Sequence, residues 1–225
     1  MKKNIIEKAE QEERIKLSKK GEKVLLMLSK IMEFTFDKET EYTIISSILP
    51  FSPFEKNSFY FSILSKTEEA KKQYNDILFL LAHEVSHFIL FDILRSKQIK
   101  LYPHELYFLK EILAVIVLKD KPLIDILCTE NYKGNNILHR LCVRDGVEVK
   151  NIVEYFEKVY SDKKIQGSNF EEYLDLMIEK IRSISGALKH KYSLWMDKKP
   201  KSGNEQDFLK NYRRAIPLDS KVDKT

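Results

Sequence analysis

The apolar stretch ILFLLAHEVSHFILFDIL, residues 77–94, decides the fold of this chain. The pattern around it predicts a helix from Lys66 to about Ser96, opened by the helix-start sequence Thr67-Glu-Glu-Ala. A helix that is apolar on nearly all sides packs inside a protein. Burying two histidines and a glutamate on such a helix is costly unless these side chains have partners. The stretch therefore predicts a central helix that carries a polar site.

Three short segments before this helix are typical of strands. They are rich in β-branched and aromatic residues and are separated by the turn-like sequences DKET and PFSPFEKN. We expect strands at residues 33–36, 42–48 and 58–64, paired in a small antiparallel sheet. A helix over residues 2–33 precedes them, and its apolar second half packs on the same domain.

The chain after the central helix is predicted to be mainly helical. Pro103 is a good first-turn residue, so a second central helix is expected to run from it to about Lys119. Further helical segments are expected near residues 122–129, 136–143, 147–160 and 169–195.

Composition agrees with a helical globular protein. The 225 residues are 43% hydrophobic and 32% charged, which excludes the disordered and fibrous classes. Six glycines and six prolines are few, so a many-turned sandwich or barrel is not expected. We predict an α+β, mainly helical fold with a small antiparallel sheet, two central helices and a helical C-terminal region. The expected organisation is a domain over residues 1–120, a helical subdomain over 121–196 and a flexible basic tail over 197–225.

Charge, cysteine content and apolar runs bear on location and partners. The net charge of +5 is too mild to indicate a nucleic-acid partner. Cys128 and Cys142 are too few for a disulfide framework, and the start MKKNIIEKAEQEERIKLSKK lacks the apolar core of a signal peptide. The longest uninterrupted apolar run, Ile112–Leu118, is far shorter than the roughly 20 residues that a membrane span needs. We expect a cytoplasmic protein without a membrane span.

Residues 83–87, HEVSH, match the motif HExxH. On a helix, His83 and His87 lie one turn apart on the same face, so both imidazoles can bind one ion. Neutral imidazole suits Zn²⁺, and a catalytic zinc site has three protein ligands and a fourth position for water. Glu84 lies beside that face and is the expected general base. The metzincin continuation, with a glycine and a third histidine, is excluded because Leu90 and Ile93 occupy those positions.

The third ligand is to be sought downstream of the motif. The candidates are Asp92, His104, Glu105 and Glu111. Asp92 lies on the motif helix and faces away from the ligand side. Glu111 lies among apolar residues in LYFLKEILAVIVL, where a lone carboxylate needs a cation. The alternative is an exposed Glu111 beside Lys110.

Helix geometry favours Glu111. If the two central helices are joined by a short connection and run antiparallel, Glu111 comes level with His87, about 12 Å along its helix. His104 and Glu105 then lie in the first turn, roughly 10 Å below that level.

HEVSH with a later glutamate in KEILA resembles the gluzincin metallopeptidases, and the short chain is most similar to the small soluble minigluzincins. The resemblance covers roughly residues 33–120. It implies a zincin-like core and one Zn²⁺ per chain, bound by His83, His87 and Glu111, with Glu84 as general base.

The resemblance also implies a substrate site. An extended peptide would pair with an edge strand at residues 59–64, so Phe59, Phe61 and Ile63 are the expected substrate-binding residues. Some gluzincins carry an acidic residue four positions after the ligand glutamate, where this chain has Val115. The residue that orients a ligand histidine is therefore not identified by the sequence.

The function predicted from these patterns is that of a zinc metallopeptidase acting on a peptide or protein. His104 and Tyr107 are expected either to donate hydrogen bonds to the transition state or to serve as core residues. One alternative is a regulatory metallopeptidase of the repressor-cleaving type. Another is a non-catalytic, zinc-stabilised protein or nucleic-acid binding module, favoured by residues 188–214, which have eight Lys/Arg against three Asp/Glu and interleaved aromatics.

Overall fold

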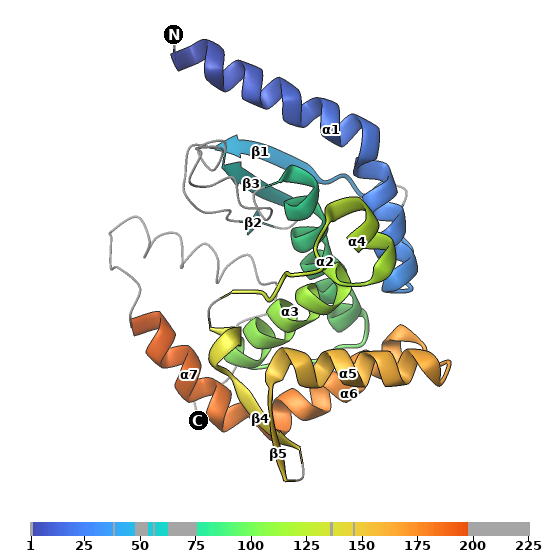
Figure 1. Ribbon diagram of the computed structural model, residues 1–225, viewed down its shortest axis with the longest axis vertical. Helices are drawn as coiled ribbons and strands as arrows, with labels where there is room; N and C mark the ends of the chain where they lie inside the picture. Colours follow the sequence, from blue (N-terminus) through green and yellow to red (C-terminus); the bar gives the residue numbers. More distant parts are fainter. Residues whose placement is uncertain are drawn as a thin grey trace.

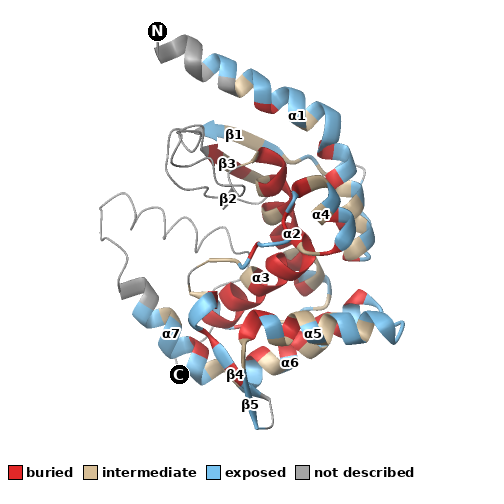
Figure 2. Ribbon diagram, in the orientation of Figure 1, coloured by how far each residue is buried: buried red, intermediate tan, exposed pale blue. Residues whose placement is uncertain are grey.

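The computed structural model describes residues 2–37, 39–47, 54–55, 57–62, 76–135, 137–145 and 147–197. The fold is α+β and mainly helical, as predicted from the sequence. Two helices form its centre, α2 (Ile77–Ser96) and α3 (Pro103–Leu118). Both are buried over most of their length (Figure 2), and the other elements surround this pair (Figure 1).

Helix α2 begins at Ile77 because Asp76 caps it. The backbone of Asp76 is extended, and its carboxylate accepts a hydrogen bond from the backbone N–H of Leu78 at 2.9 Å. The predicted helix is therefore not continuous through Asp76, and its earlier part, residues 66–75, lies outside the described residues. The end of the helix at Ser96 is confirmed.

Helix α3 begins at Pro103, as predicted. The Glu105 carboxylate accepts a hydrogen bond from the backbone N–H of Tyr102 at 2.9 Å, which ties the start of the helix together. The connection from α2 is short and turns at Gln98, whose φ of 53° is left-handed. This turn sends the chain back so that α3 packs on α2.

Among the described residues, α2 is the one helix long and apolar enough to cross a membrane. Most of that stretch is buried inside the protein, as in the core helix of a globular domain. Helix α1 (Lys2–Ile31) packs along it, and α4 (Lys121–Leu127) packs on α1 (Figure 1).

The small sheet is mixed, whereas an antiparallel sheet was predicted. Its strands are β1 (Thr43–Ser47), β2 (Phe54–Glu55) and β3 (Ser58–Ser62), in the order β1-β3-β2. The two-residue strand β2 turns back antiparallel on β3, which leaves the other side of β3 for β1, and those two strands are parallel. The predicted edge strand over residues 59–64 is therefore wrong at its start, because Phe59 has a paired strand on both sides.

Residues 33–36 do not form the predicted first strand. Glu33 takes a left-handed backbone conformation with φ 47°, just after α1 ends. The rings of Phe34 and Phe36 then meet edge to face, and Phe36 meets Tyr42 in the same way. Aromatic packing in an irregular segment replaces strand pairing here.

The C-terminal region packs on α3. It contains a short 3₁₀ turn, η4, a β-hairpin and the three helices α5, α6 and α7. All three helices contact α3. Their bounds are η4 (Leu138–Arg140), β4 (Cys142–Asp145), β5 (Glu148–Asn151), α5 (Ile152–Ile165), α6 (Phe170–Ser183) and α7 (Ser185–Asp197). One continuous cluster of buried side chains joins the predicted domain and subdomain.

The β4–β5 hairpin replaces parts of two predicted helices, near residues 136–143 and 147–160. The two strands pair antiparallel, with Val143 opposite Lys150. The sequence held the signal: Asp145-Gly146 between short runs with alternating apolar residues is typical of a tight hairpin turn. The predicted helix over 169–195 is interrupted at Ile184, between α6 and α7.

Candidate metal centre

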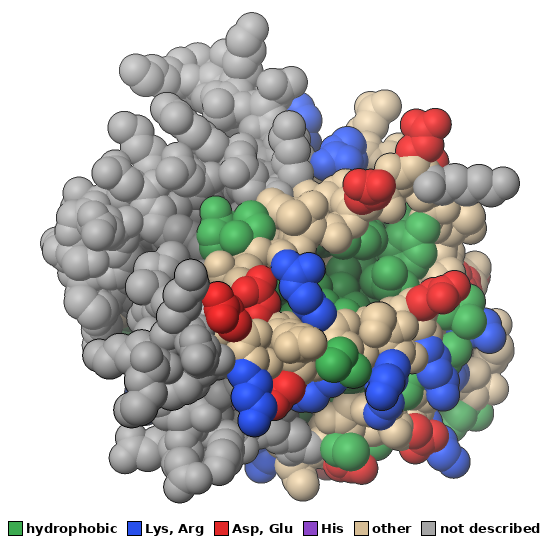
Figure 3. Space-filling model, turned by 90° about the horizontal axis from the view of Figure 1, so that it is seen from above, with side chains coloured by type: hydrophobic (Ala, Val, Ile, Leu, Met, Phe, Trp, Pro, Cys, Tyr) green, Lys and Arg blue, Asp and Glu red, His purple; other side chains and the backbone are tan. Residues whose placement is uncertain are grey.

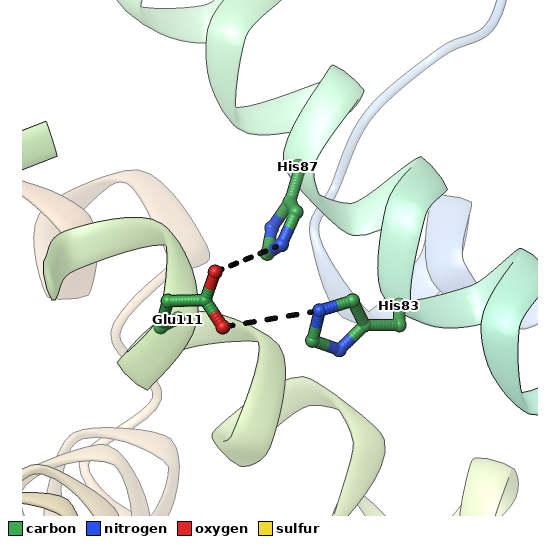
Figure 4. Close-up of side chains that lie close together, drawn as sticks. All are labelled: His83, His87 and Glu111. Atoms are coloured by element: carbon green, nitrogen blue, oxygen red, sulfur yellow. Dashed lines mark ion pairs between the residues drawn. The ribbon is translucent and has the colours of Figure 1, made fainter. Parts of the chain in front are cut away.

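His83 and His87 project from one face of α2 toward Glu111 on α3 (Figure 4). The Nε2 atom of His83 lies 4.0 Å from Oε2 of Glu111, and Nε2 of His87 lies 3.9 Å from Oε1. The two imidazole rings are 4.5 Å apart at their centroids. The predicted ligand set is thus brought together by the packing of α3 on α2.

The three side chains fit a zinc ion. One ligand atom from each lies within 4.8 Å of the others, and this is the one such group in the described part of the chain. Ligands about 2.1 Å from one tetrahedral ion lie about 3.4 Å from each other, so the longest separation would have to close by about 1.4 Å on binding. Two neutral nitrogens and one carboxylate oxygen are also donors that zinc prefers.

Burial keeps both histidines neutral. It lowers the pKa of His83 to about 4; the positive charge of Lys110 also lowers it, and only the negative charge of Glu111 opposes this shift. The pKa of His87 is lowered well below its usual value for the same first reason, with Lys110 and His83 adding to the effect. Neutral imidazole is the form that binds a metal, so these residues are ready as ligands at neutral pH.

Glu111 is ionised, in contrast to what burial alone would cause. Burial raises the pKa of its carboxyl, but the positive charge and the hydrogen bond of Lys110 outweigh this, and the pKa is lowered. His83 adds to this effect only where its own ring is protonated. Asn135 donates a hydrogen bond to Oε2 at 3.3 Å, which also favours the carboxylate. The site therefore offers two neutral nitrogens and one negative oxygen.

Glu84 is buried, with 6% of its surface exposed. Its Oε2 atom accepts no hydrogen bond from any residue that the structure describes. Burial raises its pKa to about 8, with Lys110 opposing and Glu111 adding to the shift. A carboxyl that gains and loses its proton near neutral pH is suited to general acid and base work.

A buried lysine completes the charges of the site. Lys110 is 5% exposed, and its ammonium group donates a hydrogen bond to Oε1 of Glu111. The same ammonium lies 5.5 Å from the centre of the Tyr107 ring. The sequence suggested Lys110 only as a neighbour of an exposed glutamate, and the structure does not bear that alternative out, because Glu111 is 12% exposed at its side chain.

Two residues from the segment after α4, Tyr132 and Asn135, contact the ligand side chains. The Tyr132 hydroxyl lies 3.4 Å from Nδ1 of His83, while Nε2 of the same ring faces Glu111. With the proton on Nδ1, the ring would donate to the hydroxyl and keep its Nε2 lone pair for an ion. Sequence reasoning missed both residues, because no local pattern connects this segment to the motif.

Gly134 lets this segment approach so closely. Its φ is +78°, and a Cβ atom there would lie 2.7 Å from Cγ2 of Val115 and 2.7 Å from Cδ1 of Leu138. Val115 is the position at which some gluzincins have an acidic side chain. In this protein the valine packs beneath the returning chain instead, and Tyr132 approaches the ligand histidine.

The other predicted site residues lie elsewhere. His104 bonds through Nε2 to the Ser185 hydroxyl at 2.8 Å, on α7. The Tyr107 hydroxyl accepts a hydrogen bond from Asn135 at 3.0 Å, and the same amide donates to Glu111, so Asn135 links Tyr107 to the ligand. Two of the expected substrate residues, Phe59 and Phe61, lie on β3 and are buried in the core of the protein. The third, Ile63, lies outside the described residues.

Comparison with known proteins adds no assignment to this geometry. The site consists of two imidazoles, an ionised carboxylate and a second carboxyl, Glu84, whose pKa is raised. No protein-family model, curated protein or solved structure matches this chain.

Proposed function

We propose that the protein is a zinc-dependent metallopeptidase that hydrolyses peptide bonds in a peptide or protein substrate. The observation that carries this proposal is the convergence of His83, His87 and Glu111 beside the buried carboxyl of Glu84. The three ligands have the residue types and the ionisation that zinc binding needs, and Glu84 has the residue type of a general base. We also propose that one Zn²⁺ binds per chain and that the protein acts in the cytoplasm.

The number of ligands favours a catalytic site over a structural one. Structural zinc sites are closed by four protein ligands, whereas catalytic sites keep one position open. Three ligating side chains converge here among the described residues, and no fourth His, Cys, Asp or Glu joins them. A purely structural ion would leave Glu84 buried with no role.

The roles of the residues follow from their positions. When bound, zinc supplies Lewis acidity and lowers the pKa of a coordinated water toward about 7. Glu84 takes a proton from the attacking water and passes it to the leaving amine. Tyr132 holds the ring of His83, and Asn135 holds the carboxylate of Glu111. The divalent charge favours the ionised form of Glu84, which is the form that accepts a proton.

A nucleic-acid binding role has less support. Binding faces for nucleic acid gather basic side chains, but on the face seen in Figure 3 the described Lys and Arg side chains are interspersed with Asp and Glu. Most of the basic stretch 188–214 lies outside the described residues. The repressor-cleaving alternative shares the same site and differs only in its substrate.

Replacing the general base tests the proposal. Glu84→Gln preserves size and hydrogen bonding but removes the proton acceptor. We expect its zinc content, measured by elemental analysis, to equal that of the wild type, while cleavage of a broad peptide library falls by roughly a hundredfold or more. Equal cleavage by both proteins, or no cleavage by zinc-loaded wild type, would contradict the proposal.

A further inference from the structure

Among the lysines that the structure describes, Lys110 is unusual because its charge is inside the site. A lysine side chain on a helix normally extends its ammonium group to water. Lys110 is 5% exposed and instead directs its ammonium to Oε1 of Glu111. Lys119, the residue that caps the C-terminal end of α3, shows the ordinary case, because its side chain is a quarter exposed and pairs with Glu157.

The ammonium and a metal ion would use the same carboxylate. Oε1 of Glu111 faces Nε2 of His87 at 3.9 Å, which is the side on which an ion shared by the ligands would lie. The hydrogen bond from Lys110 goes to this same oxygen. A cation next to a bound divalent ion is also repelled by it, and the low dielectric of a buried site strengthens that repulsion.

We propose, building on the function given above, that Lys110 competes with the metal ion for Glu111 and so lowers the metal affinity of the site. In the metal-free protein, the ammonium neutralises a carboxylate that would otherwise be buried without a counter-charge. Metal binding displaces the ammonium from Oε1. The Tyr107 ring, 5.5 Å away, provides a place where the displaced cation is still stabilised.

Because of this exchange, the ligands are assembled before metal binds, but the metal affinity of the site is reduced. The ligands remain assembled without metal because Lys110 replaces its charge, and metal is taken up only where its free concentration overcomes the competitor. An intracellular peptidase with such a site would be switched on by metal supply.

Metal titration of Lys110→Gln tests the competition. Glutamine keeps a hydrogen-bond donor for Glu111 but removes the charge. The full chain is stripped with a chelator and titrated with Zn²⁺ against a chromogenic competitor. We expect the zinc affinity to rise tenfold or more over wild type. Lys119→Gln, which makes the same charge change away from the ligands, should alter the affinity less than twofold.

The other possible results of the titration distinguish failure of the competition from failure of the proposed peptidase function. Unchanged or weaker zinc binding by Lys110→Gln overturns the competition, and cleavage by the wild type would then still support the peptidase. Zinc binding by Lys110→Gln alone, with none by wild type, supports the competition while removing the basis for zinc catalysis in the native chain. Circular dichroism establishes that the variant is folded; if it is not, Lys110→Met replaces it in the same titration.

Discussion

Glu111 of α3 lies level with His87 of α2, with Oε1 and Nε2 3.9 Å apart. Residues from two helices can face one ion only if the connection between the helices sets their axial offset. The turn through Gln98 and the start of α3 at Pro103 set it. His104, in the first turn of α3, is directed to Ser185 instead.

Two alanine variants separate these positions. Glu111→Ala removes the negative ligand, and we expect zinc content after dialysis against a weak chelator to fall to a small fraction of one ion per chain. His104→Ala removes a buried ring of the same helix and should leave zinc content nearly unchanged. Elemental analysis measures both. Zinc loss in His104→Ala with retention in Glu111→Ala would show that the ligand set is wrong.

The central helix pair was predictable because its signals are local. The apolar run that contains HEVSH, and Pro103 at the start of α3, define helices without reference to distant residues. Glu111 was predictable for the same reason, since a carboxylate in an apolar helix needs a cation. The structure places its largely buried carboxylate 4.0 Å and 3.9 Å from the two histidines, and its role as a metal ligand stays a prediction.

The sheet and the surroundings of the ligands depend on contacts that no local pattern contains. The parallel pairing of β1 with β3 is set by which strand reaches the free side of β3, not by the composition of either strand. Tyr132 reaches His83 only because Gly134 allows close approach to Val115. Phe59 was predicted to bind substrate, but its side chain is buried in the core, and alternation in a strand does not show which face is buried.

Tyr132→Phe is expected to weaken zinc binding by about tenfold. The change removes the hydroxyl 3.4 Å from Nδ1 of His83 but keeps the ring that meets Phe79 edge to face. Partners that orient a ligand histidine typically contribute 10–100-fold to metal affinity. Competition with a chromogenic chelator measures the change. Tyr155→Phe, on the half-buried face of α5, is the control, and equal affinities of the two variants would remove Tyr132 from the site.

Gly134→Ala should destabilise the protein and the site together. The new Cβ atom would lie 2.7 Å from both Val115 and Leu138, in addition to the strain at φ +78°. We expect a loss of about 2–4 kcal/mol in the free energy of unfolding, with weaker zinc binding. Gly167→Ala is a matched control, because Gly167 has φ +74° but no atom within 4 Å of the added Cβ. Urea unfolding should give a loss of only about 1–2 kcal/mol there. Equal losses would mean that the close approach to Val115 does not matter.

The stability of the metal-free protein should fall as pH rises from 6.5 to 8. Burial raises the pKa of Glu84 from 4.5 to about 8, so in this window the folded chain holds a proton that the unfolded chain has lost. A folded state that binds more protons loses stability as pH rises, by up to about 1.4 kcal/mol per pH unit for one group. Below pH 6.5 the effect is offset, because His83, with its pKa lowered to about 4, binds its proton more readily in the unfolded chain.

Glu84→Gln isolates this carboxyl, because glutamine does not titrate. Urea unfolding of chelator-treated protein at pH 6.5 and pH 8 should show a loss of about 1–2 kcal/mol in the wild type that the variant lacks. The variant should still gain stability between pH 4 and 6.5, because His83 and His87 remain buried and neutral. The same fall in both proteins would mean that Glu84 is ionised in the folded metal-free chain. A carboxylate that is only 6% exposed would then need a counter-charge, and the positive charge of Lys110 acts in that direction.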